Sequence, residues 1–292
     1  MGSSRSHQAL ITAQLKSQLR TCLRRAMRAL AGKRIPSPES VHNARKLLKE
    51  ARAILRLLRH AIGEREYRRE NRGLRNVARS LSGVRDAQIV MVTFDRLVAT
   101  RRSTRAFKAL RPRLARRVMQ ARRAVLDAPT RTAILVKLGS TVRRIRRYRT
   151  PSRDTDSFKN GMRRLYRKGR KSFKYARSEP ADESFHEARK DAKYLSLALG
   201  VLQSGGVHVS RRATRHARAV ARLLGQDHDL AVLIRDLDPL LRDAPTRQRG
   251  IRRKIVETRK KVRSRALRAG RLLYKRKPRA FVPHCIEFGK NT

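Results

Sequence analysis

Apolar residues recur at spacings of three and four over long stretches of this chain, with polar or basic residues between them. One such seam consists of Val41, Ala44, Leu48, Ala51, Leu55 and Leu58. This spacing is typical of an amphipathic α-helix that buries a single stripe. No segment alternates apolar and polar residues over a useful length, as a half-buried strand would. The pattern therefore predicts an all-α protein.

Glycine and proline are sparse and clustered, and their clusters mark the expected helix ends. These breaks fall at residues 32–40, 63, 128–129, 150–156, 178–182, 205–206, 244–245 and 278. Ser40 and Ser184 are the expected N-caps of the two helices that follow them. The segment around residues 129–151 is expected to hold a helix over residues 134–149 and to cross from one half of the chain to the other.

The apolar pattern repeats at a period close to half the chain length. Adding 144 to the seam positions leads to Phe185, Ala188, Ala192, Leu195, Leu199 and Leu202. The flanking segments match at an offset of 143, so that LSGVRD at 81–86 faces LGQDHD at 224–229. Residues 103–127 and 246–275 align poorly, although both are long, basic and helical in pattern. The repeat predicts two helical bundles of about four helices each, over residues 1–150 and 151–292, related by pseudo-twofold symmetry.

The net charge of the chain is strongly positive, which predicts an anionic binding partner. Lys and Arg number 76 against 22 Asp and Glu, which gives a formal charge of +54. Hydrophobic residues still make up 39% of the chain, which argues against disorder. A compact body with this charge repels itself, and a polyanion would relieve the repulsion.

The repeat also duplicates basic positions. In the first strip, Arg68, Arg72, Arg75 and Arg79 correspond to Arg211, Arg215, Arg218 and Arg222. In the second strip, Arg20, Arg24 and Arg28 correspond to Arg163, Arg167 and Lys171. In the third strip, His42, Arg45, Lys46 and Lys49 correspond to His186, Arg189, Lys190 and Lys193, and Arg52 and Arg56 extend the first copy. Like charges three and four residues apart destabilise a helix, and a helix selected for solubility would alternate signs. The alternative is a set of solvated faces in an arginine-rich chain. Because the same positions recur on six predicted helices, we interpret the strips as a phosphate-binding surface.

The composition favours recognition of phosphate over recognition of bases. Aromatic residues make up only 4% of the chain, and there is no tryptophan. Proteins that read sequence or bind single strands use side chains aimed at base edges or aromatic rings that stack on bases. No helix-turn-helix or zinc-finger pattern is present. A bare phosphate chain is therefore the favoured ligand, and non-specific nucleic-acid or ribosome binding remains the alternative.

Several other classes are not expected. The two cysteines have no neighbours at metal-ligand spacing, and no segment reads as a membrane span or a signal peptide, so we expect a soluble cytoplasmic protein without metal, cofactor or membrane association. Asp86, Asp227 and Asp229 fit ion pairs with arginine better than metal ligands. There is no Walker loop, and the E-x-E sequence at Glu64–Glu66 falls in a helical pattern. Catalysis is therefore not expected.

Two motifs with the pattern H-x-x-R-K-x-x-K, at 42–49 and 186–193, resemble the signature helices of the conserved histidine α-helical domain (CHAD) family. LSGVRD, LGQDHD, GMRRLYRKGR at 161–170 and KPRAF at 277–281 extend the similarity over roughly residues 10–282. The resemblance implies two four-helix bundles with internal twofold symmetry and a basic central groove or pore. It also implies binding of inorganic polyphosphate, and in bacteria association with polyphosphate granules.

Carried onto this chain, the resemblance assigns the binding role to the duplicated basic positions. The candidates are Arg20, Arg24, Arg28, His42, Arg45, Lys46, Lys49, Arg52, Arg56, Arg68, Arg72, Arg75, Arg79, Arg163, Tyr166, Arg167, Arg170, His186, Arg189, Lys190, Lys193, Arg211, Arg215, Arg218 and Arg222. The second copy departs from the first where Ser196 and Gly200 replace Arg52 and Arg56. The two histidines either fix their helices or add a protonated imidazole to the site, which would bind phosphate more tightly at acidic pH.

Overall fold

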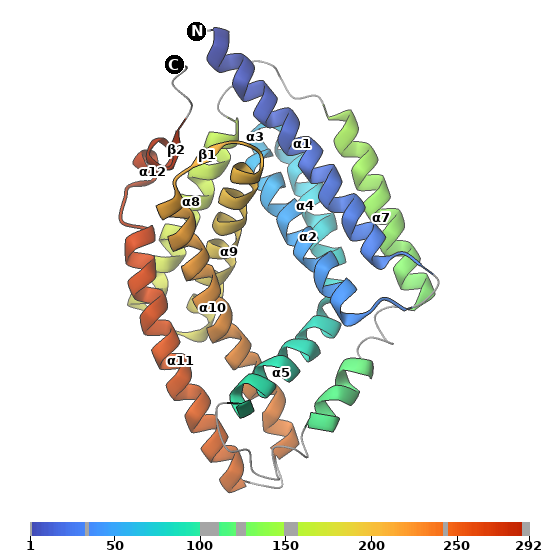
Figure 1. Ribbon diagram of the computed structural model, residues 1–292, viewed down its shortest axis with the longest axis vertical. Coiled ribbons are helices and arrows are strands. Elements are labelled where there is room, and N and C mark those ends of the chain that lie inside the picture. The colour runs from blue at the N-terminus through green and yellow to red at the C-terminus, as the bar shows by residue number, and fades with distance from the viewer. Residues whose placement is uncertain are drawn as a thin grey trace.

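The computed structural model describes residues 2–32, 35–99, 111–120, 127–148, 157–241 and 245–287, which are almost entirely helical (Figure 1). The helices are α1 (Gly2–Leu30), α2 (Pro38–Leu57), α3 (Arg59–Ile62), α4 (Glu64–Ser80), α5 (Ser82–Ala99), α7 (Ala128–Arg147), α8 (Ser157–Ser178), α9 (Asp182–Ser204), α10 (Arg211–Leu237), α11 (Pro245–Leu273) and α12 (Pro278–Cys285). Residues 111–120 are also helical, and Asp238–Leu241 forms a 3-10 turn. Strand β1 (His208–Val209) pairs antiparallel with β2 (Ile286–Glu287). The all-α prediction is confirmed.

The helices pack in two sets. In the first set, α2 contacts α1 and α4, and α7 contacts α1 and α4; in the second, α8, α9, α10 and α11 pack in sequence, and α12 covers α8. Every residue of the two predicted seams is buried, and all of them belong to one continuous hydrophobic core. The apolar spacing therefore identified the buried face of α2 and α9 correctly. The internal symmetry and the basic groove stay predictions.

The two sets meet along α2, which packs against both α8 and α9. Gly161 makes this approach possible, because a Cβ atom there would lie 2.7 Å from the Leu57 Cα atom and from the carbonyl oxygens of Arg56 and Leu57. Further along the chain, α5 runs from the end of α4 to the lower part of α10, so that the ribbons form a closed frame in Figure 1. There Phe94 of α5 and Leu233 of α10 belong to a second, smaller core.

Both predicted N-caps are wrong. Helix α2 begins three residues earlier than expected, because Ser37 is the N-cap and its hydroxyl accepts a hydrogen bond from the Ser40 backbone N–H at 3.1 Å. Pro38 then occupies the first helical position, where its missing N–H costs nothing. In α9, which begins at Asp182, the Ser184 hydroxyl instead donates to the carbonyl of Ala181 at 2.8 Å.

The linking helix also differs from the prediction. Asp127 caps α7 by accepting a hydrogen bond from the Thr130 backbone N–H at 3.1 Å, so the helix begins at Ala128. It packs on α1 and α4 and is therefore part of the first set of helices. The predicted basic helical stretch at 103–127 lies mostly outside the described residues. Among the helices that are described, none is both long and apolar enough to span a bilayer.

Two buried carboxylates hold helices together by pairing with arginine. Glu70 of α4 accepts two hydrogen bonds from Arg144 of α7, at 2.7 and 2.8 Å, and one from the Tyr148 hydroxyl at 2.6 Å. Asp227 of α10 accepts hydrogen bonds from Arg259 and Arg263 of α11, at 3.0 and 2.9 Å. Although burial opposes the shift, these bonds hold the pKa of Glu70 below its usual value and that of Arg259 above it.

Candidate functional site

Basic side chains from four helices gather around the contact between α2 and α9. We call them, with the two neutral residues that they contact, the central cluster: Lys46, Lys49, Arg52 and Arg56 of α2, Asn71 and Arg75 of α4, His186, Arg189, Lys193 and Tyr194 of α9, and His228 of α10. Nine of the eleven are lysine, arginine or histidine. The cluster exists because the buried seams hold α2 and α9 together and leave their basic faces adjacent.

Two arginines of α2 are fixed by neutral partners. The guanidinium carbon of Arg56 lies 3.6 Å from the ring centroid of Tyr194, and that of Arg52 lies 5.4 Å from it. Both side chains also donate to the Asn71 Oδ1 atom, Arg52 through Nε at 3.1 Å and Arg56 through Nη1 at 3.3 Å. A tyrosine face and an amide oxygen orient these guanidinium groups without neutralising their charge.

The cations crowd one another. Burial lowers the pKa of Arg52, and the charges of Arg56 and Arg75 lower it further. Desolvation likewise lowers the pKa of Lys193, together with the charges of Arg189 and Lys46. Within the described part of the chain, Lys46, Arg52, Arg56, Arg75 and Lys193 form no ion pair with a carboxylate. This arrangement costs free energy until an anion is present.

The histidines of the second set form a pair at the edge of the cluster. The rings of His186 and His228 lie 5.2 Å apart, centroid to centroid. Burial lowers the pKa of His228 to about 3, and nearby positive charges, including those of Arg189 and Lys49, contribute. Burial also lowers the pKa of His186. Both rings are therefore neutral near pH 7, and a bound polyanion would raise both pKa values.

Many of the other predicted residues line grooves or lie on exposed faces of the helices. Arg28 lies with Lys46 in a groove between α1 and α2 of about 570 Å³, and Arg68 and Arg72 line a groove of about 640 Å³ that includes Lys137 of α7. Arg24, Arg79, Arg167, Arg211, Arg215, Arg218 and Arg222 are exposed, and Arg20 and His42 are half-buried. The role of these side chains stays a prediction.

Besides Arg52, Arg56 and Arg68, four predicted residues make hydrogen bonds or ion pairs within the protein. Arg45 donates to the Ala78 carbonyl at 2.5 Å, Arg163 to the Asn160 Oδ1 atom at 2.7 Å, and Arg170 to the Tyr274 carbonyl at 3.1 Å. Lys190 pairs with Glu187 on its own helix at 2.5 Å. These contacts tie up part of the duplicated basic set, so its members are not equivalent as ligands for phosphate.

The structure contradicts the assignment of Tyr166 to the binding surface. Its side chain is completely buried, and its ring stacks on Phe281 of α12 with centroids 3.7 Å apart. Its hydroxyl donates to the backbone carbonyls of Leu273 and Arg276, at 3.2 and 3.0 Å. Tyr166 therefore fastens α12 to α8 and is removed from the candidate site.

Sequence reasoning missed three members of the cluster. Tyr194 directly follows the second H-x-x-R-K-x-x-K motif, and its position beside the motif was the available signal. Asn71 lies inside the arginine strip of α4, and His228 lies inside the LGQDHD motif. Their roles depend on which helices meet, which the spacing along one helix does not specify.

No group of three or more His, Cys, Asp or Glu side chains able to hold a metal ion occurs among the described residues. Asp227, considered with Asp229 as a possible metal pair, accepts hydrogen bonds from Arg259 and Arg263. The side chain of Asp86 lies outside what the structure describes. Glu64 lies at the start of α4, where it pairs with Arg59 and Arg68.

Comparison with known proteins places this chain among its relatives. The family model described as the CHAD domain matches residues 13–233. The fold resembles the crystal structure of the CHAD domain from the plant Ricinus communis, with a TM-score of 0.68 and 18% sequence identity, covering 92% of this chain and 93% of that one. No curated protein matches the sequence. The family match confirms the resemblance found in the motifs, and the chain belongs to the CHAD domain family.

Proposed function

We propose that the protein binds inorganic polyphosphate at the central cluster and does not catalyse its hydrolysis. Membership of the CHAD family supports a polyphosphate-related role. The observation that carries the proposal is the set of five cations, Lys46, Arg52, Arg56, Arg75 and Lys193, that lie together on α2, α4 and α9 with no ion pair to any described carboxylate.

Such a cluster suits a linear chain of phosphates. Each phosphate unit carries negative charge and oxygen acceptors, and arginine can donate two parallel hydrogen bonds to one phosphate. Binding would replace the mutual repulsion of the cations with attraction and release the counterions condensed on the chain. Because Tyr194 and Asn71 already orient Arg52 and Arg56, little side-chain order must be gained on binding.

The proposal assigns no chemistry to the site. Enzymatic hydrolysis of a phosphoanhydride usually needs a metal ion held by carboxylates to stabilise the developing charge. Asp191 of α9 pairs with Lys168 of α8, and Glu187 pairs with Lys190, so each of these carboxylates already has a cationic partner. We therefore propose a binding module that associates in the cytoplasm with polyphosphate granules.

A competition experiment tests the ligand class. Labelled long-chain polyphosphate is bound to the full chain at about 150 mM salt, where surface charges are already screened, and challenged with RNA or DNA at equal phosphate concentration. We expect the nucleic acids to compete at least roughly 100-fold less well, because they space their phosphates differently and present bases that the cluster does not read. Equal competition would overturn the proposal in favour of non-specific nucleic-acid binding.

A matched pair of variants tests the location. The central variant carries K46Q, R52Q, R75Q and K193Q, and the control variant removes four exposed cations of α11 by R252Q, R253Q, K260Q and K261Q. Both lose the same formal charge. We expect only the central variant to lose most of its polyphosphate affinity, and an equal loss in both would contradict a localised site.

A further inference from the structure

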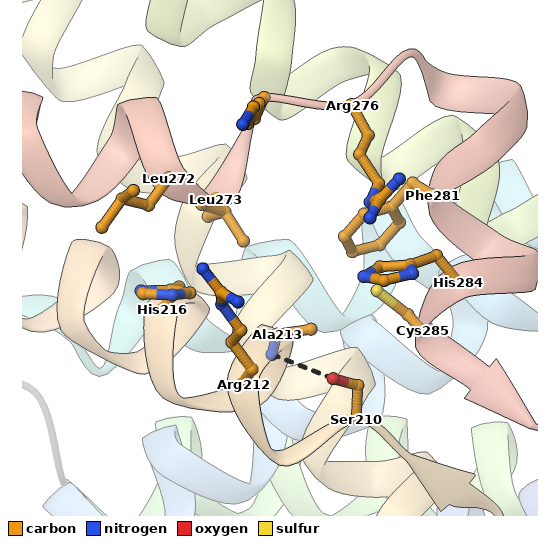
Figure 2. Close-up of a pocket in the computed structure, with 11 residues that line it drawn as sticks. Ser210, Arg212, Ala213, His216, Leu272, Leu273, Arg276, Phe281, His284 and Cys285 are labelled. Atoms are coloured by element: carbon orange, nitrogen blue, oxygen red, sulfur yellow. Dashed lines mark hydrogen bonds between the residues drawn. The ribbon is translucent and has the colours of Figure 1, made fainter.

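A separate basic cleft lies at the start of α10, far from the histidine pair. Arg212 and His228 are 16 residues apart on α10, which is roughly 24 Å along the helix axis. The cleft has a volume of about 430 Å³ and is enclosed by the start of α10, the end of α11 and helix α12 (Figure 2). Its size is within the range of pockets that bind small molecules.

The polar lining of this cleft is almost entirely basic. Its basic residues are Arg212, His216, Lys275, Arg276 and His284, and no carboxylate is among the lining residues. None of these five side chains has an ion pair or hydrogen bond with another described residue. In Figure 2, Arg212 and His216 lie on the α10 side of the cleft and face Arg276 and His284 across it. Converging cations without a protein anion form a site for a compact ligand with several negative charges.

The wall of the cleft is held rigidly. The Tyr166 hydroxyl and the Arg170 side chain fasten the segment that joins α11 to α12 through the carbonyls of Leu273, Tyr274 and Arg276. On the other side, the Ser210 backbone N–H donates to the Cys285 carbonyl at 2.8 Å, which ties the start of α10 to the end of α12. Both walls are therefore formed before any ligand arrives, which reduces the ordering cost of binding.

The rest of the lining is apolar, which distinguishes this cleft from the central cluster. Ala213, Leu272, Leu273 and Phe281 contribute to the walls. Leu272 is 55% exposed, so its side chain is accessible to a ligand in the cleft. A bare phosphate chain has no apolar group that could pack against this apolar lining. A phosphate ester has an organic group that could pack there.

We propose that this cleft binds a nucleoside di- or triphosphate, with the phosphates between Arg212 and Arg276 and the base or sugar against Leu272. His216 adds to the positive charge of the cleft when it is protonated. Burial lowers the pKa of His216, together with the charges of Arg212 and Arg215, so the ring is neutral in the empty cleft and would take up a proton when phosphate binds. The site is independent of polyphosphate binding at the central cluster.

Binding of magnesium-free ATP and of tripolyphosphate to the full chain is measured by equilibrium dialysis at about 150 mM salt, which screens diffuse surface binding. We expect ATP to bind more tightly than tripolyphosphate. The variant R212A/R276A should weaken ATP binding roughly 100-fold, at about tenfold for each lost charge-assisted contact. Both arginine side chains are exposed, so the variant is expected to fold, which circular dichroism checks. The control R271A/R279A removes two exposed arginines that do not line the cleft and should change the affinity less than about twofold.

Two further variants separate the possible outcomes. L272S should weaken binding of ATP but not of tripolyphosphate, and equal effects on both would overturn the nucleotide assignment. The central variant should keep its ATP affinity, and a loss there with no loss in R212A/R276A would move the ligand to the central cluster. No saturable ATP binding, or equal losses in R212A/R276A and R271A/R279A, would overturn the site itself.

Discussion

Arg259 and Arg263 of α11 differ from Arg52 and Arg56 of α2 in the partners that the protein gives them. The α11 pair meets Asp227 at 3.0 and 2.9 Å and also reaches Asp182 at the start of α9. The α2 pair meets the Asn71 amide and the Tyr194 ring and no described carboxylate. Each pair of arginines is held in place by specific contacts, but only the charges of the α11 pair are neutralised by carboxylates.

The difference separates arginines that stabilise the fold from arginines that are available to a ligand. Neutralised cations contribute to the folded state when the structure is empty, whereas crowded cations oppose it and are relieved by an anion. The large positive charge of the chain does not by itself distinguish the two kinds. The partner of each guanidinium group distinguishes arginines that stabilise the fold from arginines that are available to a ligand.

The largest effect is expected from breaking the neutralised pair. Asp227 is 4% exposed, so D227N would leave two partly buried guanidinium groups without their main partner. We expect a loss of about 3 kcal/mol or more in the free energy of unfolding, measured by urea denaturation. D182N at the exposed carboxylate should cost less than about 1 kcal/mol. Equal losses in D227N and D182N would mean that burial does not determine how much each ion pair contributes to the free energy of unfolding.

A smaller effect is expected from pH, through His228. Its pKa is lowered to about 3 in the folded protein, so the unfolded chain binds the proton more readily once the pH falls below the ordinary histidine value. Stability contributed by the neutral ring is present above about pH 6.5 and is lost as the pH falls, by up to about 2 kcal/mol at pH 5. The groups that face this ring are Arg189, His186, Arg235 and Lys49.

The measurement compares urea unfolding of the parent protein and H228Q at pH 7 and pH 5. The variant should lose less stability on acidification, and identical losses would exclude His228 as the source. Polyphosphate should reverse the sign, because the bound polyanion favours the protonated rings: we expect tighter binding at pH 5.5 than at pH 7.5 in the parent and a weaker pH dependence in H228Q.

The smallest effect is expected from relieving repulsion in the empty protein. K193Q removes a charge whose neighbours are Arg189 and Lys46, and should raise the free energy of unfolding by about 0.5 kcal/mol at low salt. The gain should fall away at high salt. K261Q on the exposed face of α11 serves as the control and should change stability less. A destabilised K193Q protein would show that Lys193 supports the fold.

The features of the fold that depend on the sequence of a single helix were predictable. The three-and-four spacing identified the buried seams of α2 and α9, because burial of a stripe depends on the helix period alone. The helix starts were mispredicted, although Pro38 one residue after Ser37 was a usable signal for the α2 cap. Asp127, two residues before Pro129, was a comparable signal for α7.

The candidate site was predictable only as a set of basic positions. Which of them come together depends on how helices distant in sequence pack, which places Arg56 against Tyr194 and brings the charge of Lys49 near His228. Tyr166 was assigned to the binding site because of its motif, but its ring is buried against Phe281, which lies more than a hundred residues later in the chain. Periodicity assigns a face to a residue but does not name the neighbour on that face.

The salt dependence of polyphosphate binding tests the central claim most directly. The slope of log affinity against log salt is measured for the parent, the central variant and the α11 control variant. Each lost phosphate contact reduces the slope by roughly 0.7 to 0.9, so the central variant should lose about 3 from its magnitude and the control less than about 1. Equal reductions in the two variants would show that polyphosphate samples the whole basic surface and would contradict a binding site at the central cluster.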